Sequence, residues 1–440
     1  MILYIKTDLK DTAWLQYILD EFQRTELCEF SVQAVNTDES INSDCSIYYL
    51  KNLRAETVSV PCRAGVLSEE VEFLSENLFI IKGTSAGSGG FSLNYDLFWN
   101  AFVYMSRLEE FSAEQSGKKI RSYSLAHPRK DKSTFSIPVV NHLFIDLKSL
   151  ISASFSALKF GRKKKPTIEF SHDIDYIRKT IQLRLKQTAF NSFKTLRSVS
   201  RPASFFQNFR KTFSFFLSSP DYWPFDFWEQ ADAKYNIQSV FYIYAAAGQK
   251  NFRSWLIDPS YDIRRDRTVR NALRRLISMG FKAGLHGSYR SAVSEIQLKT
   301  EKEILAETSG TEITMTRQHW LNYEENITPY IHEKLFAFDS TLGWNDRIGF
   351  RSGFASQYRP YDHRNRRPFD YFITPQIIMD SNIYDYGSGR ESELENKSVQ
   401  ILENLESFSS SFVSISWHDR VFTEDYGWFP FYERIQKLYG

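Results

Sequence analysis

The chain has 440 residues, enough for two or three domains or for one α/β barrel with a smaller module. It is 42% hydrophobic and 25% charged, as expected of a globular protein, and its net charge of +2 favours no particular partner. No run reaches the roughly 18 apolar residues needed to span a bilayer, so no membrane-spanning helix is expected.

The amino terminus and the cysteines predict a cytoplasmic protein. The first eight residues, Met1 to Asp8, carry charges and no apolar signal core. Cys28, Cys45 and Cys62 are odd in number and lack the close spacing of a metal site, so we expect reduced thiols.

The first part of the chain is predicted to be a smaller N-terminal α/β accessory domain, residues 1–145. Short apolar strands at 2–5, 46–50 and 79–81 alternate with helical stretches such as 12–22. A glycine-rich loop at 82–90 could cradle a phosphate, but it lacks the Gly-Lys-Ser/Thr ending of a P-loop. A flexible surface loop is the favoured interpretation.

The second part, residues 165–440, follows a basic patch at 161–166 and repeats one unit. A short apolar run ends in polar or ionisable residues and a helical pattern follows, such as 268–279 with its stop at Gly280. The runs are 167–170, 239–244, 282–285, 313–316, 335–338, 371–374 and 412–416. Seven strands alternating with helices predict a (β/α) barrel rather than an open sheet.

Polar residues gather where these strands end. Asp173 and Asp175 follow the first run, and side chains two apart on a strand can project the same way. Two converging buried carboxylates need a metal, a proton or a cation, although a turn whose aspartates cap a helix is the alternative. Further candidates follow later runs: His286, Arg317, His319, Asp339 and His418. Because strand ends of a barrel converge on one face, we expect an active site there.

Six short motifs in this order resemble the polysaccharide deacetylase (NodB-homology) superfamily, carbohydrate esterase family 4. Its nearest branch carries an N-terminal α/β domain of unknown function. The motifs are Ser171-His172-Asp173-Ile174-Asp175, Gly284-Leu285-His286-Gly287-Ser288-Tyr289, Thr316-Arg317-Gln318-His319-Trp320-Leu321, Phe338-Asp339-Ser340-Thr341-Leu342-Gly343-Trp344, Gly349-Phe350-Arg351-Ser352-Gly353 and Ser416-Trp417-His418-Asp419. The resemblance implies a distorted (β/α) barrel that holds a divalent metal, usually zinc, and removes N- or O-linked acetyl groups from glycans.

The resemblance also implies a role for each matching residue. Asp173 corresponds to the general base, and Asp175 and His286 to metal ligands. Arg351 corresponds to the arginine that orients the base, and His418 to the general acid. A metal would polarise the acetyl carbonyl and lower the pKa of water, while the base and the acid move protons.

The second motif departs from the family, which normally supplies a second histidine four residues after the first. Arg290 stands at that position here, and an arginine cannot ligate a metal. His319, on the next strand end, is the favoured third ligand, and if it faces inward it completes an Asp175, His286 and His319 set. If it packs outward, the site is a weak metal binder or a degenerate one. Asp339 is either a partner that orients a histidine or a helix cap.

An insert at residues 176–220 is longer than a strand-to-helix connection requires. It carries nine Lys and Arg, eight Phe and no Asp or Glu. This composition suits a segment that lies on an anionic membrane surface, or one that contacts an acidic or diphosphate-linked glycan. A helical lid with a solvated basic face is the simpler interpretation. No nucleic-acid recognition motif accompanies the charge.

The sequence therefore predicts a metal-dependent hydrolase that deacetylates a saccharide or lipid-linked glycan precursor, in the cytoplasm or peripheral to the inner face of the membrane. The alternative is a catalytically degenerate protein that keeps the barrel and binds glycan or assists polysaccharide assembly. Amide hydrolysis on a small non-sugar substrate is a third possibility.

Overall fold

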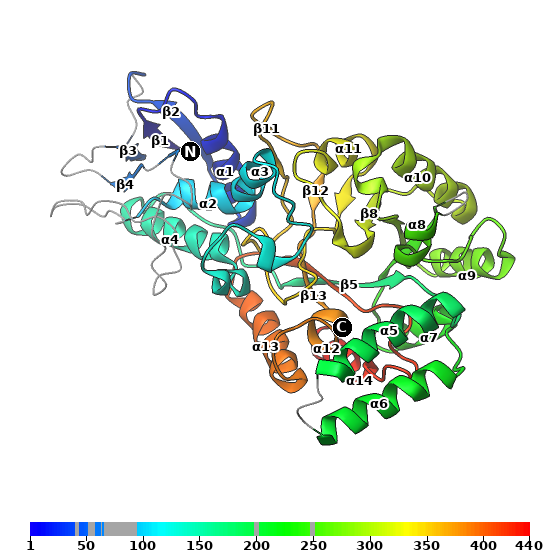
Figure 1. The fold of residues 1–440 in the computed structure, drawn as a ribbon. Coiled ribbons are helices and arrows are strands. Elements are labelled where there is room, and N and C mark those ends of the chain that lie inside the picture. Colours follow the sequence, from blue (N-terminus) through cyan, green and yellow to red (C-terminus); the bar gives the residue numbers. More distant parts are fainter. Residues whose placement is uncertain (40–43, 52–57, 63, 66–94, 198–201, 247–250) are drawn as a thin grey trace. The chain divides into compact units, whose positions relative to one another are not determined.

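The computed structural model describes the chain except for residues 40–43, 52–57, 63, 66–94, 198–201 and 247–250 (Figure 1). Contacts divide it into two compact units. The first is Met1–Ile168 with Tyr323–Ser414, and the second is Glu169–Asn322 with Ile415–Gly440. These units follow from contacts alone, so the predicted domains at 1–145 and 165–440 stay a prediction.

The amino-terminal segment of the first unit forms a four-stranded parallel sheet with the order β2-β1-β3-β4. Its elements are β1 Ile2–Thr7, α1 Ala13–Thr25, β2 Ser31–Asn36, β3 Ser46–Leu50 and β4 Ser59–Pro61. Side chains of β1 alternate between buried and more exposed positions, as a strand with one core face requires. The strands predicted at 2–5 and 46–50 and the helix at 12–22 are confirmed. The strand at 79–81 and the loop at 82–90 lie outside the described residues.

The rest of the first unit is mostly helical. Its helices are α2 Leu97–Met105, α3 Leu108–Gln115, η1 Ser124–Ala126, η2 Lys132–Ser136, α4 Val139–Ser154, α11 Thr328–Leu335, α12 Asp380–Tyr384, α13 Glu391–Asn404 and η5 Leu405–Ser407. Its short strands are β9 Phe338–Asp339, β10 Tyr361–Asp362, β11 Arg367–Pro368, β12 Phe372–Ile373 and β13 Gln376–Met379. The carboxylate of Asp96 begins α2 by accepting from the backbone N–H of Trp99, at 2.8 Å.

The second unit is built on parallel strands joined by helices. Its strands are β5 Thr167–Ile174, whose first two residues belong to the first unit, β6 Val240–Tyr244, β7 Lys282–Gly287, β8 Met315–Gln318 and the end of β14 Phe412–Ser416. Its helices are α5 Ile181–Arg197, α6 Pro202–Leu217, α7 Pro224–Ala233, α8 Phe252–Ile257, α9 Arg267–Ser278, η3 Ser291–Val293, α10 Glu295–Ser309, η4 His319–Leu321 and α14 Phe429–Tyr439. β5, β6, β7 and β8 pair in parallel, with Tyr244 opposite His286 and His286 opposite Arg317.

The strands after residue 165 belong to one sheet with the order β12-β9-β8-β7-β6-β5-β14-β13, apart from the β10-β11 hairpin. Each of the seven predicted runs overlaps one of these strands. The α/β class is thus confirmed, but the number of strands in the sheet is eight rather than seven. The missed strand, β13, follows β12 across Pro375, which divides one apolar stretch in two.

Local sequence explains the helices around the second unit's strands. The predicted helix at 268–279 is α9, and the carboxylate of Asp266 caps it by accepting from two backbone N–H groups. The insert at 176–220 forms the helices α5 and α6, which lie side by side (Figure 1). Among the described residues, no helix combines the length and hydropathy that crossing a bilayer requires.

Candidate metal centre

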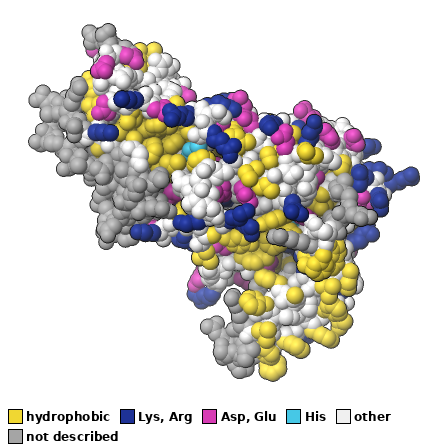
Figure 2. All heavy atoms as spheres, turned by 45° about the horizontal axis from the view of Figure 1, so that its top comes forward, with side chains coloured by type: hydrophobic (Ala, Val, Ile, Leu, Met, Phe, Trp, Pro, Cys, Tyr) yellow, Lys and Arg dark blue, Asp and Glu magenta, His cyan; other side chains and the backbone are white. Residues whose placement is uncertain are grey.

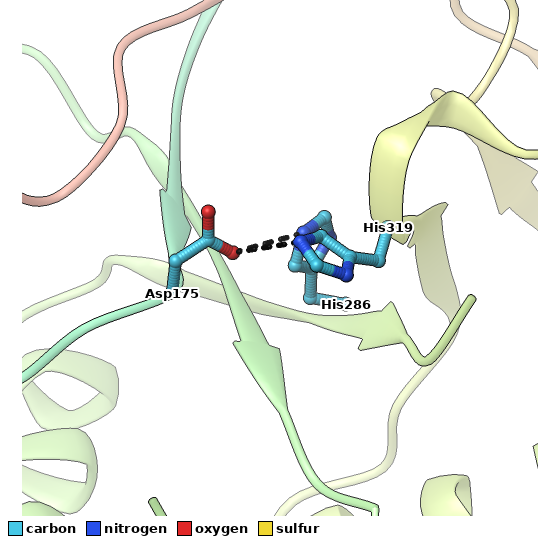
Figure 3. A group of neighbouring side chains, drawn as sticks. All are labelled: Asp175, His286 and His319. Carbon is cyan, nitrogen blue, oxygen red and sulfur yellow. Dashed lines mark ion pairs between the residues drawn. The ribbon is translucent and has the colours of Figure 1, made fainter. Parts of the chain in front are cut away.

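Three side chains that the sequence predicts as metal ligands meet at the carboxyl ends of three strands of one sheet. Asp175 directly follows β5, His286 belongs to β7 and His319 directly follows β8. Nε2 of His286 lies 3.4 Å from Oδ1 of Asp175, and Nε2 of His319 lies 3.6 Å from the same oxygen (Figure 3). His319 therefore faces inward, the orientation that the sequence left open. Arg290, at the position of the family's second histidine, is exposed.

Each histidine is oriented through its other ring nitrogen. Nδ1 of His286 lies 3.0 Å from the backbone oxygen of Arg317, and Nδ1 of His319 lies 3.1 Å from Oδ1 of Asp258. An acceptor at Nδ1 favours the tautomer with the proton on Nδ1, which leaves Nε2 available as a ligand. The sequence analysis did not find Asp258, because the residue lies between α8 and α9 without any motif around it.

The residues of this cluster fit a divalent metal. Oδ1 of Asp175 and Nε2 of His286 are buried and have no hydrogen-bond partner, which is costly for polar atoms. A cation bound between them would satisfy both. The ligand atoms of Asp175, His286 and His319 all lie within 4.8 Å of one another. One carboxylate and two imidazoles, with a fourth position open, are a donor set that suits zinc in hydrolytic sites.

The charges in the cluster favour an ionised Asp175 and a neutral His319, the forms that ligate a cation, but they favour the protonated form of His286, whose proton a metal would have to displace. Burial raises the pKa of Asp175, but His319, His286 and His418 outweigh it and hold this pKa well below its usual range. Burial lowers the pKa of His319, and Asp175 only partly opposes this effect. Burial also lowers the pKa of His286, but Asp173 and Asp175 outweigh it, so this pKa is raised.

Asp173 is fully buried and pairs with a buried arginine. Nη1 of Arg317 donates to Oδ1 of Asp173 at 2.6 Å and to the hydroxyl of Ser171 at 2.9 Å. The guanidinium also lies over the ring of Tyr242, 4.2 Å from its centroid. Burial raises the pKa of Asp173, but Arg317 outweighs it and lowers the pKa. Asp173 is therefore ionised near neutral pH.

Arg351, to which the resemblance gave the role of orienting Asp173, makes other contacts. Its Nη2 and Nε donate to the two carboxylate oxygens of Glu110, at 2.6 and 3.0 Å, and both side chains are buried. The arginine that contacts Asp173 in the structure is Arg317. In the sequence, Arg317 stands at a strand end and in the third motif, but nothing there pairs it with Asp173.

The motif around His418 supplies three neighbours of Asp175. Nε2 of His418 lies 3.9 Å and Nη1 of Arg420 lies 3.1 Å from Oδ2 of Asp175, the oxygen that does not face the two ligand imidazoles. The carboxylate of Asp419 accepts from the backbone N–H groups of Asp175 and Tyr176, at 3.1 and 2.8 Å. Burial raises the pKa of Asp419 to about 7. Asp419 thus fixes the backbone that carries Asp175.

Asp339 pairs with a histidine outside the candidate ligand set. It lies in the first unit, where Oδ2 contacts Nδ1 of His332 at 3.0 Å and Oδ1 accepts from the backbone N–H of Thr341 at 2.7 Å. Asp339 thus orients a histidine, but one that is not a candidate ligand.

No family model matches the chain, and no curated protein matches it. Solved structures do. The chain is similar to a Mycobacterium smegmatis protein described as a polysaccharide deacetylase, with 12% identity, 64% of this chain and 86% of that chain covered, and a TM-score of 0.37. It is similar to Puue allantoinase, with 10% identity, coverage of 62% and 83%, and a TM-score of 0.37. It is also similar to the polysaccharide deacetylase Bc1974 from Bacillus cereus, with 9% identity, coverage of 63% and 88%, and a TM-score of 0.28. At these scores, any case for the chemistry depends on the side chains described above.

Proposed function

We propose that this protein is a metal-dependent hydrolase that removes N- or O-linked acetyl groups from a saccharide or lipid-linked glycan precursor in the cytoplasm. One observation carries the proposal. Asp175, His286 and His319 converge from three strand ends, and two of their buried ligand atoms have no hydrogen-bond partner. Asp173, the proposed general base, and His418, the proposed general acid, belong to the same unit.

The residues of the site divide the work. Asp175, His286 and His319 would hold the metal, because one carboxylate and two imidazoles are a ligand set that suits zinc. When bound, such a cation polarises the acetyl carbonyl and lowers the pKa of water. Asp173, kept ionised by Arg317, accepts the proton of the attacking water. His418 donates a proton to the departing amine or alkoxide.

Metal content tests the proposal without an activity assay. We expect about one zinc per purified chain by elemental analysis, and loss of this zinc in His286→Ala and in His319→Ala. His142→Ala is the matched control, since His142 lies in α4 and belongs to no ligand cluster among the described residues. A wild-type protein that stays empty at micromolar zinc would contradict the proposal.

The second candidate function is that of a degenerate glycan-binding or assembly protein. Arg420 favours it, because a guanidinium 3.1 Å from Asp175 neutralises the carboxylate that should attract a cation. Arg290, which stands where the family has a histidine, also favours this candidate. This candidate predicts glycan binding by a zinc-free protein. A screen of acetylated sugars against cyclic amides separates sugar deacetylation from hydrolysis of a small amide.

The helices α5 and α6 support a further partner, an anionic membrane surface. Exposed apolar side chains recur at helical spacing on α6: Phe206 is 69%, Phe209 58% and Phe213 60% exposed. Ile181, Leu185, Phe193 and Leu196 do the same on α5. Figure 2 shows hydrophobic side chains gathered over the part of the molecule that carries these helices. With nine basic and no acidic residues in 176–220, this apolar face suits anionic lipid.

Vesicle flotation tests the membrane partner. Wild type should float with vesicles that contain anionic lipid at low salt, and a Phe206→Ser, Phe209→Ser and Phe213→Ser variant should lose at least tenfold in affinity, since each phenyl ring contributes about 1 kcal/mol when partly buried. The control replaces Leu125 and Ile296 by serine, since both are more exposed than these phenylalanines and lie outside 176–220. If wild type and the triple variant both stay with the unbound protein, the membrane is not a partner.

A further inference from the structure

A cavity of about 530 Å³ is lined in part by the residues that follow the metal aspartate in the sequence. Tyr176, which lines it, is the residue after Asp175. Tyr261 lines it too, and its hydroxyl donates to the backbone oxygen of Ile174 at 2.6 Å. The other lining residues are Ile177, Arg178, Thr180, Ser260, Asp262, Arg265, Asp266 and Arg267. The backbone that holds the metal aspartate therefore also forms one wall of the cavity.

The backbone that joins the metal aspartate to the cavity lining is held in position. Asp419 accepts from the backbone N–H groups of both Asp175 and Tyr176, and the hydroxyl of Tyr261 also accepts from the backbone N–H of Tyr244, at 3.0 Å. A group bound in the cavity would thus lie at a set position relative to Asp175. Two tyrosine rings on this wall suit contact with a sugar ring.

The charge of the cavity lining is positive. Three arginines line it against two aspartates, and each aspartate contacts one of these arginines, so Arg267 supplies the net positive charge. Asp266 caps α9 with Oδ1 and contacts Arg178 through Oδ2 at 2.8 Å. Asp262 accepts from the backbone N–H of Arg264 and lies 3.6 Å from Arg265. Arg267 forms no ion pair with any described residue, so its charge is available to a ligand.

We propose that this cavity binds the phosphate or diphosphate of a phosphate-linked saccharide, while the acyl group of that saccharide lies at the metal centre. The proposal deepens the proposed function and rests on it for the second half. Arginine suits this ligand because its guanidinium binds phosphate oxygens in pairs. A neutral polysaccharide would make no use of the charge of Arg267.

The cavity lining leads directly into α5, one of the two helices that carry the exposed apolar side chains. Thr180 lines the cavity, and the next residue, Ile181, begins α5 and is 61% exposed. A lipid carried on the phosphate would lie along that face. A nucleoside diphosphate sugar would present the same phosphates without using it. Both sources share the diphosphate, and experiment can separate them.

Calorimetric titration of the full chain with inorganic pyrophosphate tests the cavity. The protein is first treated with chelator and dialysed, so that pyrophosphate cannot bind a metal. We expect saturable binding, and about tenfold weaker binding in Arg267→Ala, because one charge-assisted contact is lost. The matched control is Arg264→Ala, which removes the same charge from an exposed side chain that does not line the cavity. It should stay within about twofold of wild type.

Three outcomes test whether pyrophosphate binds in the cavity. Equal losses in Arg267→Ala and Arg264→Ala would show general electrostatic attraction and overturn the proposal. Loss of pyrophosphate binding in metal-free His286→Ala would place the anion at the metal centre and overturn it as well. Retained binding in a protein that takes up no zinc would support the phosphate site and contradict the proposed hydrolase.

Two further ligands identify the source of the phosphate. Farnesyl diphosphate that binds at least tenfold more tightly than pyrophosphate, with the gain lost in Ile181→Ser, would support a lipid carrier. UDP-N-acetylglucosamine that binds more tightly than pyrophosphate, with no effect of Ile181→Ser, would support a nucleotide carrier. If both bind more weakly than pyrophosphate in every protein, the cavity does not accept a phosphate-linked saccharide and the proposal fails.

Discussion

Asp258 offers a sharp test of how His319 is held. Its Oδ1 lies 3.1 Å from Nδ1 of His319 and also accepts from the backbone N–H of Tyr289, at 2.9 Å. A carboxylate at this position fixes the imidazole and raises its basicity, and its loss typically weakens metal binding 10- to 100-fold. For Asp258→Ala we therefore expect a zinc Kd larger by about 10- to 100-fold, or about 1.4–2.8 kcal/mol.

Asp258→Asn separates the charge from the hydrogen bond. An asparagine can keep an oxygen acceptor in place of Oδ1, so both contacts persist and only the negative charge is lost. We expect a smaller effect, about three- to tenfold, since a neutral acceptor supports the imidazole less well. Competition with a chromophoric chelator measures the zinc affinity of both variants. Asp262→Asn is the control, because the carboxylate of Asp262 contacts Arg264 rather than a histidine. Zinc affinity that is unchanged in Asp258→Ala would refute the reasoning about His319.

Three further variants test the charges around the site. Arg317→Met should destabilise the protein by about 3–5 kcal/mol in denaturant titration. It should also move the acid limb of hydrolysis to higher pH, because Asp173 loses the largest of the charges that lower its pKa against burial. A fixed limb would count against Asp173 as the base. Arg351→Met should also cost about 3 kcal/mol but leave zinc content unchanged. Although burial raises the pKa of Glu110, Arg351 lowers it from 4.5 to about 2, so this stability is present above pH 4.5 and is lost as the pH falls toward 2; a pH-independent difference would contradict it. Arg420→Met should tighten zinc binding in the chelator competition, because the guanidinium that competes with the metal for Asp175 is removed. Weaker zinc binding in this variant would contradict that reasoning.

The sheet could be predicted largely because its signal is local. Each predicted run after residue 165 is a short apolar stretch between turn residues, and all seven overlap strands. The eighth, β13, begins one residue after Pro375, a residue that usually ends a strand, so the pattern suggested one strand where there are two. The end of β5 was placed too early, since Ser171 to Ile174 are polar or charged in part and yet continue the strand.

The site was harder to predict where it depends on side-chain direction. His319 begins a turn in which Trp320 and Leu321 have φ of 59° and 49°, a backbone that no periodicity anticipates. Arg317 and Arg351 both stand in motifs, and only the structure shows that Arg317 contacts Asp173. Asp258 approaches His319 across 61 residues of chain, which a sequence pattern cannot indicate.

Crystals soaked in zinc and measured at the zinc absorption edge test the central claim most directly. We expect one anomalous peak in the second unit, about 2.0–2.2 Å from Nε2 of His286, Nε2 of His319 and a carboxylate oxygen of Asp175. A map without that peak, or one in which either imidazole points away from the aspartate, would contradict it.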